Sequence, residues 1–427
     1  MNSMSSGLAL VVLAAGKGKR MKSNQPKVLF DLCGRPALFY PLHAVSSLKP
    51  DRKIVVIGWG ADQIQDAFAE TDVEFVLQKD LLGTGHALQM TRDAIEDYQG
   101  DLLVLYGDGP LIREETLQAI VEKHRAEGNF ATIMTAVHED PTGYGRVIRD
   151  AEGRFRRIVE EKDADEETKK IKEVNTGITL YKCPEVFEYL ALLKDNNKQK
   201  EFYLTDLPQI FVEKGFKVGI LLHHDAEELD GFNSIDQYAK LRRKLQKRIL
   251  QNHMDHGVTI VDPETTYIDF DVQIGPGTRI LPFTVIQGSV QIGEACSIGP
   301  FSYIREGSVF DGEASIGSFV EIKNSHLKKG VYSRHLSFIG DSEVGENTNI
   351  GAGTIIANFD GKQIHRTVIG DRAFLGSGTV IIAPAEIGTD SITGAGAVIR
   401  HHTKTEPGST YLGVPAVRRN DKEGTSQ

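Results

Sequence analysis

Cysteine is scarce in this chain of 427 residues, and its three copies lie far apart in the sequence. Cys33, Cys183 and Cys296 match neither the paired spacing of a zinc site nor a disulfide framework. Reduced, unpaired thiols are typical of proteins in the cytosol. The cysteine pattern therefore predicts a cytoplasmic protein and argues against a small secreted fold held by disulfides.

Long hydrophobic runs are also missing, which argues against a membrane-spanning helix. The apolar segment 8–15 has no basic segment before it and continues directly into a loop of glycine and lysine. We interpret this segment as a buried strand rather than a signal peptide.

An excess of positive charge is absent as well. The formal net charge is -10 at pH 7, so the composition offers no basic face for nucleic acid. The basic run 242–248 lies in a stretch with helical spacing and is interpreted as a solvated helix face. We therefore expect small-molecule partners, with no nucleic acid and no membrane.

The chain does contain a period of six. An aliphatic or aromatic residue recurs at every sixth position from Ile274 to Ile322, after which the phase slips. The period returns twice, at Val344, Ile350 and Ile356, and at Ile369, Leu375, Ile381 and Ile387. Neither an amphipathic helix nor an alternating strand has this period. It is typical of a parallel β-helix, in which each hexad forms one side of a triangular coil.

The N-terminal half has a different pattern, in which short aliphatic runs alternate with helical spacing. The expected strands are 8–13, 53–58, 74–77, 102–106 and 131–136, and the expected helices include 37–47 and 114–127. This alternation predicts an α/β sheet of mainly parallel strands. The predicted segments are an α/β domain at 1–233, a linker helix at 234–253, a β-helix at 254–418 and a disordered tail at 419–427.

A loop rich in glycine and cations follows the first expected strand. Gly16 and Gly18 let the backbone bend tightly and expose N–H groups, and nearby lysines and arginine supply positive charge. A polyphosphate needs this combination of uncovered donors and cations. The spacings of a dinucleotide fingerprint and of a P-loop are both absent.

Further motifs make the sequence similar to a known family. They are PKVL at 26–29, LQ at 77–78, LGTGHA at 82–87, YGD at 106–108, DPTGYGR at 140–146, IVE at 158–160 and NTGI at 175–178. They resemble the sugar-nucleotide pyrophosphorylases. Together with the hexapeptide repeat they resemble the bacterial bifunctional N-acetylglucosamine-1-phosphate uridylyltransferase and glucosamine-1-phosphate acetyltransferase family.

The resemblance implies an α/β nucleotidyltransferase (Rossmann-like) domain, a linker helix and a left-handed parallel β-helix. It implies transfer of UMP from UTP to N-acetylglucosamine-1-phosphate, in a pathway of peptidoglycan and cell-wall synthesis. By the resemblance, Arg20 and Lys27 clamp the triphosphate, and Asp108 and Asn233 hold Mg²⁺. The implied nucleotide-binding residues are Leu13, Ala14, Ala15, Gly16, Gln78, Gly83, Thr84, Tyr106 and Gly107. The implied sugar-binding residues are Gly145, Glu160 and Asn175, with Thr84 at the same pocket.

A second site is implied in the β-helix, where acetyl-CoA would acetylate glucosamine-1-phosphate. His335 corresponds to the base that takes a proton from the sugar amine. The other implied residues of this site are Arg305, Lys323, Phe338, Asn349, Ala352, Asn358, Phe359, Ser377 and Ala395. Hexapeptide β-helices commonly associate as trimers, so a homotrimer is expected.

Several positions depart from the family pattern in this second site. Phe338 and Phe359 each stand where the family has a tyrosine, Ile364 where it has a lysine, and Gly413 where it has an arginine. The repeat is also expected to be about two coils short between Gly257 and Arg305. Two alternatives therefore remain open: a monofunctional uridylyltransferase whose β-helix is a trimerisation or regulatory scaffold, and a pyrophosphorylase for another sugar or nucleotide.

Overall fold

The computed structural model describes residues 7–95 and 97–419, and the predicted tail lies outside them from residue 420 onward. The chain divides into two compact units, whose boundary falls between Arg242 and Arg243. This boundary lies within helix α9 (Ile235–Asp255), in the region where a linker helix was expected. The domain limits at 233, 253 and 418 stay predictions.

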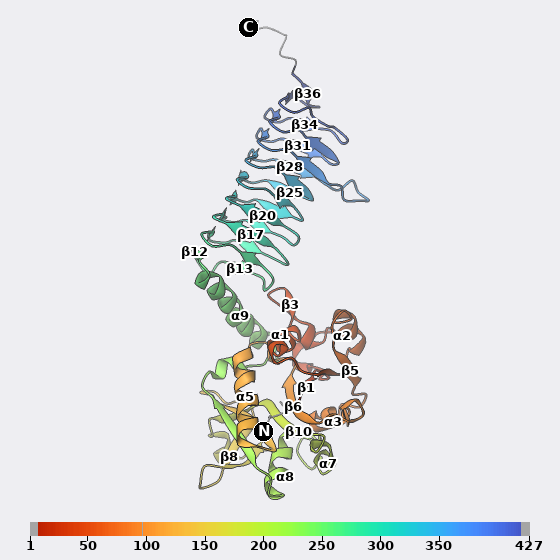
Figure 1. Ribbon diagram of the computed structural model, residues 1–427, viewed down its shortest axis with the longest axis vertical. Helices are drawn as coiled ribbons and strands as arrows, with labels where there is room; N and C mark the ends of the chain where they lie inside the picture. Colours follow the sequence, from red (N-terminus) through yellow and green to blue (C-terminus); the bar gives the residue numbers. More distant parts are fainter. Residues whose placement is uncertain (1–6, 96, 420–427) are drawn as a thin grey trace, which may run out of the picture. The chain divides into compact units, whose positions relative to one another are not determined.

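A mixed sheet forms the centre of the N-terminal unit (Figure 1). Its strand order is β11-β7-β10-β6-β1-β4-β5. In chain order its strands are β1 (Gly7–Leu13), β4 (Arg52–Ile57), β5 (Glu74–Leu77), β6 (Gly100–Tyr106), β7 (Ala131–Val137), β10 (Glu173–Cys183) and β11 (Val218–His223). Strand β10 runs antiparallel to β6 and β7, whereas the other pairs along this order are parallel. The hairpin of β8 (Arg146–Arg149) and β9 (Phe155–Val159) attaches to β10. A separate short pair is formed by β2 (Asp31–Leu32) and β3 (Arg35–Pro36).

Helices cover both faces of this sheet, as the aliphatic strand sequences require. Leu10 and Val12 of β1 pack in a cluster with α1 (Phe39–Ala44), α2 (Ala61–Ala67) and α5 (Glu114–Glu127). Val11 of the same strand packs on the opposite side, in a cluster with α3 (Thr84–Gln89), α4 (Arg92–Ile95), α7 (Val186–Leu190) and α8 (Leu207–Glu213). The result is a three-layer α/β unit, as expected. A further short helix, α6 (Glu166–Lys169), follows the β8–β9 hairpin.

The five expected strands are all present, and so are both expected helices. The first expected helix is shorter than predicted, because α1 ends at Ala44 and a 3-10 turn (Ser46–Leu48) follows. Short 3-10 turns also occur at Lys19–Met21, Lys27–Leu29, Leu204–Asp206 and Ala226–Leu229. The strands from β8 to β11 were not predicted, so the sheet has a larger antiparallel part than the sequence indicated.

The second unit is a left-handed parallel β-helix whose coils stack along the chain (Figure 1). Its first sheet contains β12 (Thr259–Ile260), β15 (Arg279–Ile280), β18 (Ser297–Ile298), β21 (Ser315–Ser318), β24 (Tyr332–His335), β27 (Asn349–Ile350), β30 (Phe374–Leu375), β33 (Ile392–Thr393), β35 (Thr410–Leu412) and β36 (Val417–Arg418). Its second sheet contains β13 (Tyr267–Ile268), β16 (Val285–Ile286), β19 (Tyr303–Ile304), β22 (Glu321–Lys323), β25 (Phe338–Gly340), β28 (Ile355–Ala357), β31 (Val380–Ile382) and β34 (Val398–Ile399). Its third sheet contains β14 (Gln273–Ile274), β17 (Gln291–Glu294), β20 (Val309–Gly312), β23 (His326–Leu327), β26 (Ser342–Val344), β29 (Thr367–Ile369) and β32 (Ala385–Ile387).

The predicted interior stack is confirmed by burial. Ile280, Ile286, Ile298 and Ile304 are fully buried, and the later members from Phe310 to Ile387 are also buried. Ile274 is the exception, because it is only half-buried in the first coil.

The two interruptions of the period have a direct structural cause. Strand β20 pairs Phe310 with Leu327, one residue closer in sequence than the pair of Ile292 with Phe310. This shorter coil moves the phase after Ile322. The second interruption is a longer insertion before Ile369, which projects beside β28 and is closed by a bridge between Phe359 and Ile364 (Figure 1).

The interior stack can be tested with two adjacent residues of β18. We expect Ile298→Ala to lower the free energy of unfolding by about 2–4 kcal/mol, because it leaves a cavity between coils. Ser297→Ala, on the outward face of the same strand, should change it by less than about 0.5 kcal/mol. Urea unfolding of the intact chain measures both, and equal midpoints would contradict the stacked interior.

Candidate functional site

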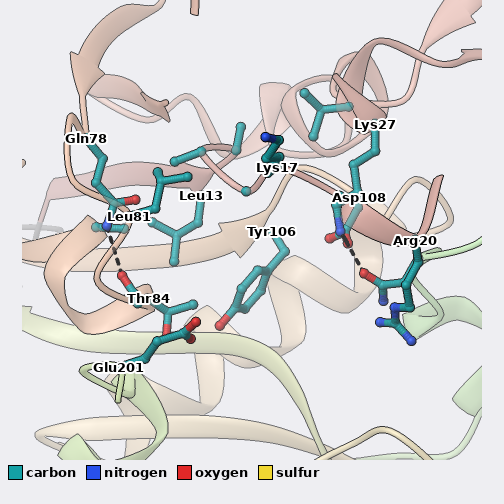
Figure 2. A pocket seen from close by; sticks show the side chains of 18 of the residues that line it. Leu13, Lys17, Arg20, Lys27, Gln78, Leu81, Thr84, Tyr106, Asp108 and Glu201 are labelled. Atoms are coloured by element: carbon teal, nitrogen blue, oxygen red, sulfur yellow. Dashed lines mark hydrogen bonds and ion pairs between the residues drawn. The ribbon is translucent and has the colours of Figure 1, made fainter. Parts of the chain in front are cut away.

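A cavity of about 520 Å³ opens at the carboxyl ends of the central strands in the N-terminal unit. Figure 2 shows Tyr106 in its middle, with Gln78 and Thr84 on one side and Lys27 and Asp108 on the other. This is the edge of an α/β sheet at which ligands usually bind. The predicted residues that line the cavity are Leu13, Ala14, Ala15, Gly16, Arg20, Lys27, Gln78, Gly83, Thr84, Tyr106, Asp108 and Asn233.

The loop after β1 keeps one wall of this cavity open. No atom lies within 4 Å of the place that a Cβ at Gly16 would take, so the bare backbone faces free space. Gly18 has a φ of +57°, in the left-handed region that favours glycine, and the side chain of Lys27 packs beside it. Arg20 follows in the 3-10 turn and is exposed at the cavity. The loop can thus present N–H groups and cations to an anion.

The opposite wall is built by the loop after β5. Gln78 is buried, and its Nε2 lies 3.0 Å from the carbonyl oxygen of Gly83 and 3.0 Å from Nδ1 of His86. Gly83 has a φ of +110°, and a Cβ there would lie 2.7 Å from the carbonyl oxygen of Phe202. Glycine is therefore required at position 83 both by backbone conformation and by space.

Two side-chain oxygens converge at the other side of the cavity. The ammonium group of Lys27 forms an ion pair with the Asp108 carboxylate and lies 3.0 Å from Oδ1 of Asn233. Asp108 follows β6, and Asn233 comes from a loop in which Gly231 lies against the Asp108 backbone. The Lys27 ammonium group thus binds both a carboxylate and an amide oxygen, which come from distant parts of the chain.

The same two oxygens fit a magnesium ion. Mg²⁺ is usually held by one or two protein oxygens and completes its shell with water and substrate phosphates. Within the described residues, no group of three or more histidine, cysteine, aspartate or glutamate side chains could hold a metal. A site with Asp108 and Asn233 would therefore depend on the substrate for its other ligands.

The predicted sugar-binding residues lie near Tyr106, since the charge of Glu160 acts on its phenol. Gly145, Glu160 and Asn175 are not among the residues that line the cavity, and neither is the predicted nucleotide residue Gly107. The backbone N–H of Asn175 donates to the carbonyl of Gly145 at 2.8 Å, and a Cβ at Gly145 would lie 3.4 Å from the Glu160 carboxylate. These three residues therefore lie together, and their role in sugar binding stays a prediction.

Burial changes the ionisation of this group. It raises the pKa of the Glu160 carboxyl, while a hydrogen bond from Thr205 Oγ1 to Oε1 of Glu160 (2.7 Å) lowers it. Burial also raises the pKa of the Tyr106 phenol, and the charge of Glu160 adds to that effect. Asp206 is half-buried nearby, and its pKa is raised to about 6 by desolvation and then by the charges of Glu160 and Asp163.

Lys17 and Gly18 also line the cavity, in the loop that was expected to face a polyphosphate. Other lining residues were not predicted as site residues: Val28, Leu81, Ala87, Lys162 and Glu201. Lys162 is two positions after Glu160, so its neighbour could have indicated it. Glu201 belongs to a segment with no recognised motif, and only its contacts reveal it.

Within one chain, the predicted acetyl-transfer residues of the β-helix lie at two opposite edges of the second sheet. His335 ends β24 and is exposed, and Ala352, Ser377 and Ala395 follow the neighbouring strands β27, β30 and β33 at the same corner. Phe338 begins the next strand at this corner, and Asn349 lies in β27.

The remaining residues lie at the opposite edge, where the strands of the second sheet end. They are Arg305, Lys323, Asn358 and Phe359. Arg305 pairs with Glu321 at 2.8 Å, and Asn358 donates to Asp341 at 2.5 Å. A Cβ at Gly340 would lie 2.8 Å from the ring of Phe338 and 2.6 Å from Nδ2 of Asn358, so this phenyl ring spans the distance between the two edges.

Ile364 and Gly413, which depart from the family pattern, are both exposed. Ile364 is 54% exposed and lines a cavity of about 280 Å³ together with His365 and Arg366. Gly413 has a φ of +86°, and the nearest atom to a Cβ there would be 3.6 Å away.

Over the described residues, no helix combines the length and the apolar character needed to cross a bilayer.

Comparisons with known proteins cover both units. The family model of the MobA-like NTP transferase domain matches residues 10–197, and that of the bacterial transferase hexapeptide (six repeats) matches 271–306 and 366–401. The bifunctional protein GlmU of Caldanaerobacter subterraneus subsp. tengcongensis is 39% identical over 450 aligned positions, covering 98% of this chain and 97% of that protein.

Other relatives carry the same name. The bifunctional protein GlmU of Syntrophotalea carbinolica is 42% identical, covering 92% of each chain, and that of Streptococcus pyogenes serotype M5 is 37% identical, covering 97% of this chain and 96% of that protein. Since these likenesses extend over nearly the whole of both chains, the chain belongs to the family of the bifunctional protein GlmU.

Proposed function

We propose that the N-terminal unit transfers UMP from UTP to N-acetylglucosamine-1-phosphate, giving UDP-N-acetylglucosamine and pyrophosphate. The observation that carries this proposal is the convergence of Lys27, Asp108 and Asn233 beside an open glycine loop. A nucleoside triphosphate needs this combination of cations, bare N–H groups and oxygen ligands for a metal. Membership of the GlmU family supports the same activity and a metal-dependent, UTP-using enzyme.

In the proposed reaction, an oxygen of the sugar phosphate attacks the α-phosphorus of UTP. The bond from this phosphorus to the bridging oxygen breaks, and pyrophosphate leaves. Arg20 and Lys27 stabilise the charge that builds on the phosphates. Asp108 and Asn233 would hold Mg²⁺, which would supply further neutralisation of the phosphate oxygens.

Two sets of residues receive the two substrates. The residues Leu13 to Gly16, with Gln78, Gly83, Tyr106 and Gly107, receive the nucleotide. Thr84, Gly145, Glu160 and Asn175 receive the sugar. Tyr106 of the nucleotide set lies in the middle of the cavity, beside Thr84 of the sugar set (Figure 2).

The metal-binding role can be tested at Asp108. We expect Asp108→Ala to lower the rate of pyrophosphate release by about a hundredfold or more, because a ligand for the metal is lost. Coupled pyrophosphate detection at several Mg²⁺ concentrations measures the effect.

Asp72→Ala is a matched control. It also removes a carboxylate paired with a lysine, Lys53, at 2.7 Å, but Asp72 is mostly exposed and lies outside the cavity. Its rate should equal the wild-type rate. If Asp108→Ala also had a rate close to the wild-type rate, Asp108 would not be a ligand of the metal.

We further propose that the β-helix acetylates glucosamine-1-phosphate with acetyl-CoA. His335 takes a proton from the sugar amine as the nitrogen attacks the thioester, and Arg305 and Lys323 hold the sugar phosphate. Asn349, Ala352, Asn358, Phe359, Ser377 and Ala395 contact the amino sugar or acetyl-CoA.

The division of these residues between two edges of one sheet supports a homotrimer. A groove between neighbouring β-helices can bring the corner of one chain next to the strand ends of another. We therefore propose a cytoplasmic homotrimer in which each acetyl-transfer site is shared by two chains.

A second candidate function is supported by Phe338, Ile364 and Gly413. Phe338 and Ile364 place apolar side chains, and Gly413 places none, where the family has a hydroxyl or a cation for the substrates. Loss of a polar contact to a charged group costs about 2–3 kcal/mol. With two such losses, the β-helix would be a scaffold for assembly rather than an acetyltransferase.

Release of free thiol from acetyl-CoA separates these two functions. We expect the intact chain to release thiol only when glucosamine-1-phosphate is present. A preparation that makes UDP-N-acetylglucosamine but releases no thiol would establish the scaffold instead.

The base can be tested in the same assay. His335→Ala should abolish thiol release and leave UDP-sugar formation unchanged, because the two reactions use different units. His401→Ala removes another exposed histidine of the β-helix and should leave both activities unchanged. Equal thiol release by His335→Ala and wild type would end the assignment of His335.

A further inference from the structure

The 201–206 segment connects the nucleotide wall of the cavity to the sugar group. At its first end it pairs with the glycine loop after β5. The N–H of Phe202 donates to the carbonyl of Leu82, and the N–H of Gly85 donates to the carbonyl of Phe202, both at 2.8 Å. The segment and the nucleotide loop therefore hold each other by backbone hydrogen bonds.

Thr84 adds a side-chain contact to this pairing. Its Oγ1 accepts a hydrogen bond from the N–H of Leu204 at 3.1 Å. Because Gly83 packs against the Phe202 backbone, the two segments have little freedom to slide. The position of residue 205 is thus fixed relative to the nucleotide loop.

At its second end the segment reaches Glu160. Thr205 is 9% exposed, and its hydroxyl donates to Oε1 of Glu160 at 2.7 Å. The surroundings of Glu160 disfavour a negative charge, since it is half-buried and lies near the charges of Asp163 and Glu201. The Thr205 hydroxyl counteracts them by stabilising the carboxylate.

A carboxylate has two oxygens, and this hydrogen bond engages only one of them. An anchored carboxylate can accept a hydrogen bond from a sugar hydroxyl without first losing rotational freedom. A carboxylate without this anchor would have to be ordered by the sugar itself, which lowers the apparent affinity.

We propose that Thr205 is a positioning residue for the sugar acceptor, because its hydroxyl fixes the Glu160 carboxylate in the orientation that binds a sugar hydroxyl. This inference rests on the proposed uridylyl transfer and goes beyond it by placing the origin of acceptor affinity in the 201–206 segment. Thr205 acts through Glu160 and does not touch the nucleotide.

The test is a comparison of Thr205→Val with the wild-type chain. Valine keeps the shape of threonine and removes the hydroxyl. The KM for N-acetylglucosamine-1-phosphate should rise by about tenfold or more, while the KM for UTP should change by less than about twofold. Thr205→Ser restores the hydroxyl and should return the sugar KM to within about threefold of the wild-type value.

Two further variants exclude a merely structural effect. Thr71→Val also removes a threonine hydroxyl that donates a hydrogen bond, but its acceptor is the backbone carbonyl of Phe68 rather than Glu160. It should leave both KM values unchanged. In a Glu160→Ala background, Thr205→Val should lower kcat/KM no further, because Thr205 acts only through Glu160.

The outcomes separate this inference from the proposed function. A wild-type chain that forms no UDP-N-acetylglucosamine would overturn both. An active wild type with an unchanged sugar KM in Thr205→Val would overturn only the positioning role. Equal increases in the KM for sugar and UTP, or a full additional loss in the Glu160→Ala background, would also overturn it and indicate a general effect on the fold.

Discussion

The N-terminal site depends on the parallel pairing of β1 with β4 on one edge and with β6 on the other. This pairing places Leu13 beside both Val56 and Tyr106, so the strands end at the same level. The loops that follow them therefore open into one cavity. Because β1 is buried on both faces, its end cannot move without disturbing two helical layers. The glycine loop and Asp108 thus have their positions fixed by the core.

The β-helix is governed by a similar rule, applied between coils. Each inward side chain lies above its partner in the previous coil, and each corner therefore repeats at the same place. The insertion before Ile369 breaks the period but not the stack, since Ile356 and Ile381 still pair across it. Asn358 and Phe359 lie at the start of this insertion, where the chain is free to project from the coil. Regular coils thus give rigidity, and the irregular one exposes the residues for which substrate contacts are proposed.

Much of the fold and part of the site could be predicted from the sequence because local patterns carried them. The aliphatic runs of the parallel strands, the period of six and the glycine loop after β1 each specify their structure over a few residues. Strand β10 could not be found in this way, since its pairing shifts register between Asn175 and Thr179 and its sequence mixes polar and apolar residues. Thr205 could not be predicted for another reason. Its proposed role depends on a contact with Glu160, which is 45 residues away in the chain, and no short sequence pattern indicates that contact.

The register of the β-helix has a consequence for changes in chain length. Each coil contacts only its neighbours, so the removal of one whole coil returns every later side chain to the same side of the triangle. The removal of one hexad would instead rotate all later corners by a third of a turn around the axis. Polar side chains that now lie on one side of the triangular coil would then lie on another. We therefore expect this repeat to tolerate deletion of three hexads at a time. A deletion of one or two hexads would move the side chains of every later coil to a different side of the triangle.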